Sequence, residues 1–194
     1  MRKESIRLRE GQAPVQPSVV ALGMFDGVHL GHQALVRQAV SLARNHGWRS
    51  VVYTFVNHPR SVFGVAPALI MDTETRRAAL YALGADQVDM VRFTKELAEM
   101  PPEDFLKMLI GRYDVRAVVA GKDFTFGYKG EGTTETLRSL GERLGFEVYE
   151  MPDVVLDGKK VSSTRIRAAL QDGDEALADR MLGREQCLRS RDVL

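Results

Sequence analysis

The chain has 194 residues, of which 44% are hydrophobic and 27% charged, a balance typical of a globular domain with a sizeable core. Its formal net charge of +1 excludes bulk electrostatic binding to nucleic acid, which needs a basic face. Its one cysteine, Cys187, cannot form an internal disulfide, and the sequence has neither a signal-like N-terminus nor an apolar run of membrane-spanning length. We therefore expect a cytoplasmic protein with no membrane partner.

In chain order, apolar and β-branched runs predict strands that alternate with helices. After a lead-in over residues 1–18, with an edge strand near residues 6–8, a buried strand covers 19–23. A turn and a helix then run over 28–45, and Gly47 lies just past the helix end, where a left-handed cap is common. Further strands are predicted over 50–55, 88–93, 117–121 and 146–151, and further helices over 73–83, 101–113, 134–144, 163–170 and 174–182.

Several of these strands are apolar on both faces, which is typical of a parallel sheet covered by helices on both sides. The predicted fold class is therefore α/β, a single doubly wound parallel sheet. In such sheets ligands bind beyond the carboxyl ends of the strands. The polar and glycine-bearing segments that follow Leu22, Phe55 and Ala120 are therefore the candidate site.

The most informative stretch is GMFDGVHLGH, residues 23–32, between the first strand and the first helix. Its two histidines lie three apart and flank a glycine that lets a ligand approach the backbone. The start of the helix adds free N–H groups and a partial positive charge, which attract anions. A lone histidine here is more often a cap or a surface residue. A pair in this setting can donate hydrogen bonds to a nucleotide α-phosphate and stabilise charge on a leaving pyrophosphate.

A second stretch, VSSTRIR over residues 161–167, precedes the helix predicted over 163–170. The simplest interpretation is that Ser162 or Ser163 caps this helix. Two arginines near a helix start, however, oppose the helix dipole, so they favour an anionic partner. The planar guanidinium of arginine also suits phosphate geometry.

Residues 23–32 resemble the H-x-G-H signature of the nucleotidyltransferase superfamily, in the form found in the FAD synthetase module of prokaryotic bifunctional riboflavin kinase/FMN adenylyltransferases. Residues 161–167 resemble the I-S-S-T-x-I-R motif of the same superfamily. The resemblance implies a Rossmann-like nucleotidyltransferase fold in which His29, His32 and Arg167 are catalytic, and in which Arg165, at the variable position, faces solvent. The implied ATP-binding residues are Gly23, Met24, Phe25, Asp26, His29, Gly31, His32, Ser162, Ser163, Thr164 and Arg167. Mg²⁺ would bridge the ATP phosphates, and Asp26 would either assist the metal or fix the turn.

Two further stretches resemble the FAD synthetase module in particular. Residues 54–59, TFVNHP, resemble T-F-x-P-H-P with Asn57 in place of proline, and residues 121–127, GKDFTFG, resemble G-x-[ND]-F-x-F-G. A phenylalanine there could stack on an isoalloxazine ring and Asp123 could accept a ring N–H, although the alternative is that both phenylalanines belong to the core. The implied FMN-binding residues are Asn57, His58, Pro59, Asp123, Phe124, Phe126, Gly127 and Lys129.

Residues 128–133 depart from the usual G-[RK]-x-G-[DN] continuation, because Lys129 is displaced by one position and Thr133 replaces an acidic or amide residue. We expect Lys129 to serve the acceptor phosphate from its shifted place. The departure also leaves open an acceptor other than FMN.

The resemblance implies a nucleotidyltransferase domain over residues 19–184. Residues 185–194 form a tail where a riboflavin kinase domain would normally begin, so the chain is either naturally monofunctional or a shortened form. The predicted activity is transfer of AMP from ATP to FMN, giving FAD and pyrophosphate, with ATP and FMN as partners and a separate riboflavin kinase as a further candidate. The alternatives are a nucleotidyltransferase with another acceptor and a non-catalytic flavin- or nucleotide-binding homologue.

Overall fold

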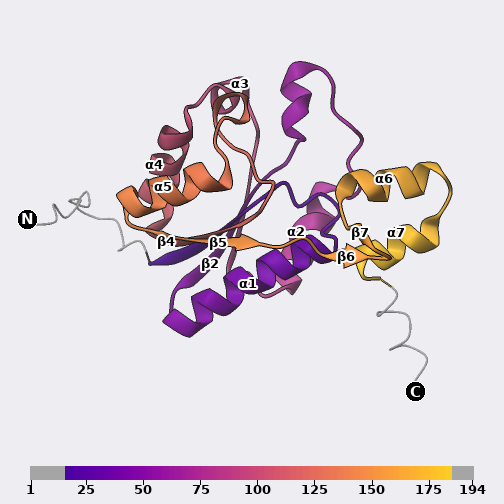
Figure 1. Ribbon diagram of the computed structural model, residues 1–194, viewed down its shortest axis with the longest axis horizontal. Helices are drawn as coiled ribbons and strands as arrows, with labels where there is room; N and C mark the ends of the chain where they lie inside the picture. Colours follow the sequence, from indigo (N-terminus) through magenta and orange to yellow (C-terminus); the bar gives the residue numbers. More distant parts are fainter. Residues whose placement is uncertain (1–15, 185–194) are drawn as a thin grey trace, which may run out of the picture.

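The computed structural model describes residues 16–184, which build a five-stranded sheet and the helices around it (Figure 1). The sheet order is β3-β2-β1-β4-β5 and every neighbouring pair is parallel. Its strands are β1 (Ser18–Leu22), β2 (Arg49–Phe55), β3 (Gln87–Val91), β4 (Val115–Gly121) and β5 (Glu147–Met151). The predicted α/β class and parallel sheet are confirmed. The edge strand expected at residues 6–8 and the tail with Cys187 lie outside the described residues.

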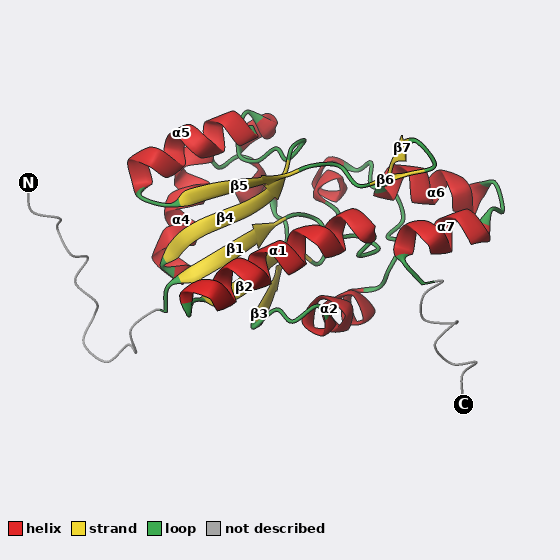
Figure 2. Cartoon of the chain, turned by 60° about the horizontal axis from the view of Figure 1, so that its bottom comes forward, coloured by secondary structure: helices red, strands yellow, loops and turns green. Residues whose placement is uncertain are grey.

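Helices cover both faces of the sheet because the side chains of β1 alternate between two apolar cores. Val19 and Ala21 pack toward α1 (Leu30–His46) and α2 (Thr73–Ala82). Val20 and Leu22 pack toward α4 (Pro102–Tyr113) and α5 (Thr134–Leu144). Figure 2 shows α1 crossing one face of the sheet, with α4 and α5 against the other. The doubly wound arrangement brings the carboxyl ends of β1, β2 and β4 to one edge.

The C-terminal part of the described chain packs as a unit of its own beyond that edge. It consists of a hairpin, β6 (Val155–Leu156) and β7 (Lys159–Lys160), followed by α6 (Ser163–Gln171) and α7 (Glu175–Leu182). The helices enclose a small apolar cluster around Ile166 and Met181, both fully buried. The amide of Gln33 joins the unit to α1 by donating to the carbonyls of Val28 and Leu182, both at 3.0 Å.

Short elements were not predicted because they span too few residues for a periodic pattern. They are two 3₁₀ helices, η1 (Pro59–Phe63) and η2 (Tyr128–Gly130), the helix α3 (Lys95–Ala98), and the β6–β7 hairpin. All lie near the carboxyl edge of the sheet, so these missed elements help to shape the candidate site.

The helices described within residues 16–184 are too short or too polar to span a membrane.

Candidate active site

The turn after β1 is strained and tightly packed. Two of its non-glycine residues, Phe25 and Val28, adopt positive φ angles of 50° and 43°, which side chains rarely tolerate. The ring of Phe25 is fully buried and lies against Gly23, where an added Cβ would stand 3.0 Å from it. This packing holds the chain in a conformation that delivers His29 to the start of α1.

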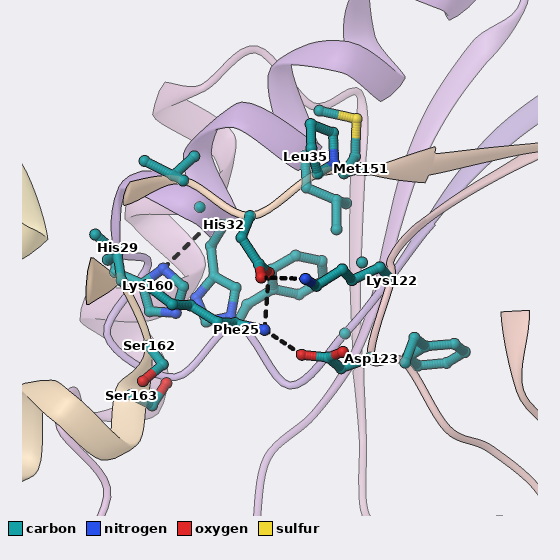
Figure 3. A pocket seen from close by; sticks show the side chains of 18 of the residues that line it. Phe25, His29, His32, Leu35, Lys122, Asp123, Met151, Lys160, Ser162 and Ser163 are labelled. Carbon is teal, nitrogen blue, oxygen red and sulfur yellow. Dashed lines mark hydrogen bonds and ion pairs between the residues drawn. The ribbon is translucent and has the colours of Figure 1, made fainter. Parts of the chain in front are cut away.

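His29 caps α1, and its ring stacks on that of His32 (Figure 3). Nδ1 of His29 accepts a hydrogen bond from the backbone N–H of His32 at 3.3 Å. The ring centroids are 3.6 Å apart and the ring planes are inclined by 15°. A Cβ on Gly31 would come within 3.2 Å of the His29 ring, so the glycine between the histidines leaves room for the stack.

Both histidines are neutral at physiological pH. Burial lowers the pKa of His29 to about 4, with a smaller contribution in the same direction from the charge of Lys160. Burial also lowers the pKa of His32, assisted by the nearby His29 and Arg76. Because Nδ1 of His29 is an acceptor, the proton of its neutral ring resides on Nε2. The ring can therefore donate a hydrogen bond from Nε2 to an anion.

The histidine pair lines a first cavity of about 280 Å³, which several charged side chains also line. The amino group of Lys160 lies 2.8 Å from the carboxylate of Asp153 and is also ion-paired with Asp123. Lys122 binds the same Asp153 at 2.6 Å (Figure 3). Lys122, Asp153 and Lys160 were not among the predicted site residues, because isolated charged residues near strand ends carry no local pattern. The cavity thus combines neutral donors with cations already balanced by carboxylates.

The serine–arginine motif closes a further side of the first cavity. Ser162 caps α6 by accepting the N–H of Arg165 at 3.2 Å, and Ser163 donates to the carbonyl of Asp26 at 3.0 Å. Thr164 is exposed. Arg165, which was expected to face solvent, is half-buried, and its guanidinium donates to the carbonyls of Leu156 and Lys159, both at 2.9 Å. Arg165 therefore holds the β6–β7 hairpin against α6.

Asp26 is buried and binds Arg167 of the same motif. Its carboxylate accepts the backbone N–H of Ile70 at 3.0 and 3.2 Å and that of Met71 at 3.3 Å, and it forms an ion pair with Arg167. Nε of Arg167 donates to the carbonyl of Ala68 at 2.9 Å. The carboxylate thus holds the turn after β1 against the segment before α2. This matches the expectation that Asp26 fixes the turn.

The donor set does not fit a protein-held Mg²⁺. The carboxylate of Asp26 is committed to Arg167 and two backbone amides. In the described part of the chain no three His, Cys, Asp or Glu side chains gather in a way that could hold a metal ion. Mg²⁺ would therefore have to come with the phosphates of a nucleotide.

A second cavity, of about 450 Å³, adjoins the first and is mainly aromatic and aliphatic. The two share Phe124, whose ring stacks on that of Phe126 with centroids 5.7 Å apart. Phe126 is 6% exposed and packs on Phe105, so it belongs to the core as well as to the cavity wall. The other residues that line the second cavity include Phe55, Pro59, Phe63, Phe93, Gly127 and Lys129. The cavity suits a flat, apolar ring system.

Some predicted acceptor residues support the second cavity rather than line it. Asn57 accepts the N–H of Phe93 at 2.8 Å and donates to its carbonyl at 3.1 Å. His58 caps η1 through the N–H of Arg60 at 3.1 Å, and burial lowers its pKa. Asp123 lines the first cavity and is paired with Lys160. The predicted residues are thus divided among the two cavities and the frame that holds them.

Arg76 is a buried part of that frame that the sequence did not indicate. It is 0% exposed and donates to three carbonyls at the ends of β1 and β2: Met24 at 3.3 Å, Phe55 at 2.6 Å and Val56 at 3.3 Å. An arginine within a helical pattern is normally a surface residue, so no local signal marks it. It joins the two strand ends that border the cavities.

The chain is similar in sequence and in fold to several known proteins. A family model described as FAD synthetase matches residues 12–165. Bifunctional riboflavin kinase/FMN adenylyltransferases from Bacillus subtilis and Listeria monocytogenes are 38% and 36% identical over 180 and 168 residues, covering 91% and 85% of this chain. The matched regions are 55% and 53% of those proteins, so the chain spans about half the length of the curated relatives it matches. A crystal structure named macrolide-efflux protein, from Streptococcus pneumoniae, is 33% identical with a TM-score of 0.78, covering 89% of this chain and 56% of that one.

Proposed function

Because the chain belongs to the FAD synthetase family, we propose that it transfers AMP from ATP to FMN, yielding FAD and pyrophosphate. One observation carries the proposal: a first cavity lined by the histidine pair and several charged side chains meets a second, mainly aromatic cavity at Phe124. A nucleotide in the first and a flavin in the second would bring their phosphates to a common boundary. Holding two reactants in this way supplies much of the rate enhancement in phosphoryl-type transfer.

In this proposal ATP occupies the first cavity with its triphosphate near the starts of α1 and α6. Nε2–H of His29 donates to a phosphate oxygen, and the ring of His32 stacks on the ring of His29 in the same cavity. Ser162, Ser163 and Thr164 at the start of α6, with Arg167, receive the pyrophosphate end. Helix starts favour such anions because their free N–H groups and dipoles point toward them.

FMN binds in the second cavity, with its ring between Phe124 and the aromatic wall and its phosphate drawn by Lys129. A phosphate oxygen of FMN attacks the α-phosphorus of ATP. The new bond joins that oxygen to phosphorus, and the bond from phosphorus to the bridging oxygen of pyrophosphate breaks. The oxygen that attacks is already ionised, so no general base is needed, and neutral histidines stabilise the added charge by hydrogen bonding.

The proposal includes Mg²⁺ as part of the ATP substrate, a cytoplasmic location, and a riboflavin kinase activity that supplies FMN. The first is supported by the commitment of Asp26 to Arg167 and backbone amides. The last is supported by the bifunctional names of the relatives. No nucleic-acid partner is proposed, in keeping with the net charge of +1.

The test is pyrophosphate release from ATP and Mg²⁺ with FMN, measured beside FAD formation by chromatography. Both products in equal amounts are expected. A panel of acceptors, with nicotinamide mononucleotide and phosphopantetheine in place of FMN, tests the altered residues 128–133. Release with another acceptor but not with FMN would reassign the substrate, and binding of ATP and FMN without release would make the protein a non-catalytic binder.

A further inference from the structure

Residues 58–71 form a surface segment beside the second cavity, which we call the lid segment. Figure 1 shows its first half as a purple stretch that projects from the body of the molecule. Three of its apolar side chains are exposed, Phe63 at 68%, Val65 at 74% and Leu69 at 37%. Pro59, Arg60 and Phe63 also line the second cavity. Exposed apolar side chains beside a binding cavity favour closure over an apolar ligand.

The two ends of the lid segment are held in different ways. Its start follows Asn57, which is tied to both backbone groups of Phe93 and so to the body of the sheet. Its end is held through Asp26, whose buried carboxylate accepts the N–H groups of Ile70 and Met71. The start is therefore anchored to the scaffold, and the end is anchored to a charged side chain of the first cavity's turn.

Arg167 makes two contacts that hold the C-terminal end of the lid segment. Its Nε donates to the carbonyl of Ala68 inside the lid segment, and its Nη2 binds the carboxylate of Asp26. Within residues 16–184, the other terminal nitrogen, Nη1, makes no hydrogen bond, and the side chain is 19% exposed. A guanidinium can hold a carboxylate on one edge and a phosphate on another, because its donors form a rigid plane.

We propose that Asp26 is a positioning residue that links the nucleotide to the lid segment, so that a phosphate held by Arg167 orders the lid and strengthens acceptor binding. The inference rests on the proposed function, because it takes Arg167 as a phosphate ligand. A nucleotide that immobilises Arg167 also immobilises its two partners, the Asp26 carboxylate and the Ala68 carbonyl. Through Asp26 it also fixes the backbone N–H groups of Ile70 and Met71, which donate to that carboxylate. The acceptor then binds to a lid that is already ordered, which makes the two binding events cooperative.

A purely structural latch makes a different prediction. If Asp26 only held Ile70 and Met71 in place, its loss would weaken FMN binding equally with and without a nucleotide. A link through Arg167 instead changes the ratio of the two FMN dissociation constants. By reciprocity the same ratio applies to the effect of FMN on nucleotide affinity.

The first experiment measures the FMN dissociation constant by flavin fluorescence, with and without Mg²⁺ and α,β-methylene-ATP, which cannot transfer AMP. We expect the analogue to tighten FMN binding by about fivefold or more in the wild type, within the range usual for coupled sites. In Asp26→Asn the ratio should fall below about twofold, because the charge that binds Arg167 is lost. Asp72→Asn is the matched control: it removes a nearby exposed carboxylate that caps α2, and it should keep the wild-type ratio.

The second experiment does not depend on the stability of a variant or on FMN. Amide hydrogen exchange of the wild type should slow at Ile70 and Met71 when the Mg²⁺–analogue complex is added alone, with unchanged exchange in β3 as the internal reference.

Unchanged exchange at both amides, or an Asp26→Asn ratio equal to the wild-type ratio, overturns the inference. If FAD forms under either of these results, the proposed function stands and only the inference fails. If the analogue slows exchange but FMN neither binds nor reacts, the nucleotide–lid link stands and the FMN assignment fails. If the analogue does not bind at all, both fail.

Discussion

Nδ1 of His29 accepts the backbone N–H of His32 while the two rings stack with centroids 3.6 Å apart. This one hydrogen bond begins α1 and also assigns the proton of His29 to Nε2. Helix capping and the proposed donation to phosphate therefore use opposite nitrogens of the same ring. The two interpretations weighed from the sequence, a cap and a catalyst, do not exclude each other.

Replacement of His32 by alanine should remove catalysis without removing the cap, because the cap uses the backbone N–H of residue 32. We expect turnover to fall by about 100- to 1000-fold, the loss typical of one charge-stabilising donor. The circular dichroism spectrum should remain that of the folded protein, although loss of a ring packed on Phe25 and His29 should lower the melting temperature. His46→Ala is the control, since His46 is exposed and stacks on Trp48 at the far end of α1. Unchanged turnover in His32→Ala would refute the proposed role.

Gly31→Ala should separate stability from activity. Alanine is the better helix former by about 1 kcal/mol, so the free energy of unfolding should stay equal or rise. The added Cβ would stand 3.2 Å from the ring of His29, which must shift by a few tenths of an ångström. We expect kcat to fall by about tenfold, since small displacements of a positioned group are costly. Equal kcat in a folded variant would show that the ring position is not critical.

The pH dependence of stability should show the buried histidine. The unfolded His29 titrates with a pKa near 6.5, whereas burial lowers its folded pKa to about 4. Between these values the unfolded state binds more protons, so the free energy of unfolding falls as pH falls through this window. The full difference is about 3 kcal/mol for this residue. Urea unfolding at pH 7, 6, 5 and 4 should show a shallower decline in His29→Gln than in the wild type, and parallel curves would contradict the assignment.

Lys129→Asn tests the shifted basic residue of the acceptor loop. Asparagine tolerates the positive φ of 51° at this position, so the loop conformation should survive. Loss of a charged hydrogen bond to phosphate should weaken FMN binding by about tenfold. Riboflavin, which has no phosphate, should bind wild type and variant alike as measured by fluorescence. Equal weakening of both ligands would mean that Lys129 contacts the ring or shapes the cavity instead.

Arg76→Met should destabilise the fold, because methionine fills much of the space but cannot donate to the carbonyls of Met24, Phe55 and Val56. The expected loss is about 2–4 kcal/mol in the free energy of unfolding, measured with urea. Arg77→Met is the matched control. Arg77 is half exposed and its ion pair with Glu74, at 3.8 Å, should be worth about 0.5 kcal/mol or less. Losses of the same size in both variants would argue against the proposed frame.

Local pattern predicted much of the fold. The order of strands and helices followed from apolar runs, glycine stops and helix caps, all of which act within a few residues. The expected strand over 50–55 became β2 (Arg49–Phe55), and the helix over 134–144 became α5 with Gly145 as its left-handed cap. The short η1, α3 and β6–β7 elements were missed because they are stabilised by their surroundings rather than by their own periodicity.

The candidate site divides in the same way. His29 and His32 could be predicted to lie together because a strand, a turn and a helix start hold them within three residues of each other. Asp123 was predicted as an acceptor-site residue, but its pairing with Lys160 could not be predicted, because 37 residues separate them. Arg76 resembled a surface arginine until the ends of β1 and β2 were seen to enclose it.

By itself, the sequence determined the α/β class, the parallel sheet and the motifs that indicate a nucleotidyltransferase site, because each depends on neighbours along the chain. Only the tertiary structure decided that Asp26 binds Arg167, 141 residues away, and that Lys122 and Lys160 share Asp153. Such pairs arise where strand ends and loops distant in sequence converge on one edge of the sheet. Their formation depends on distances in space that no local spacing encodes.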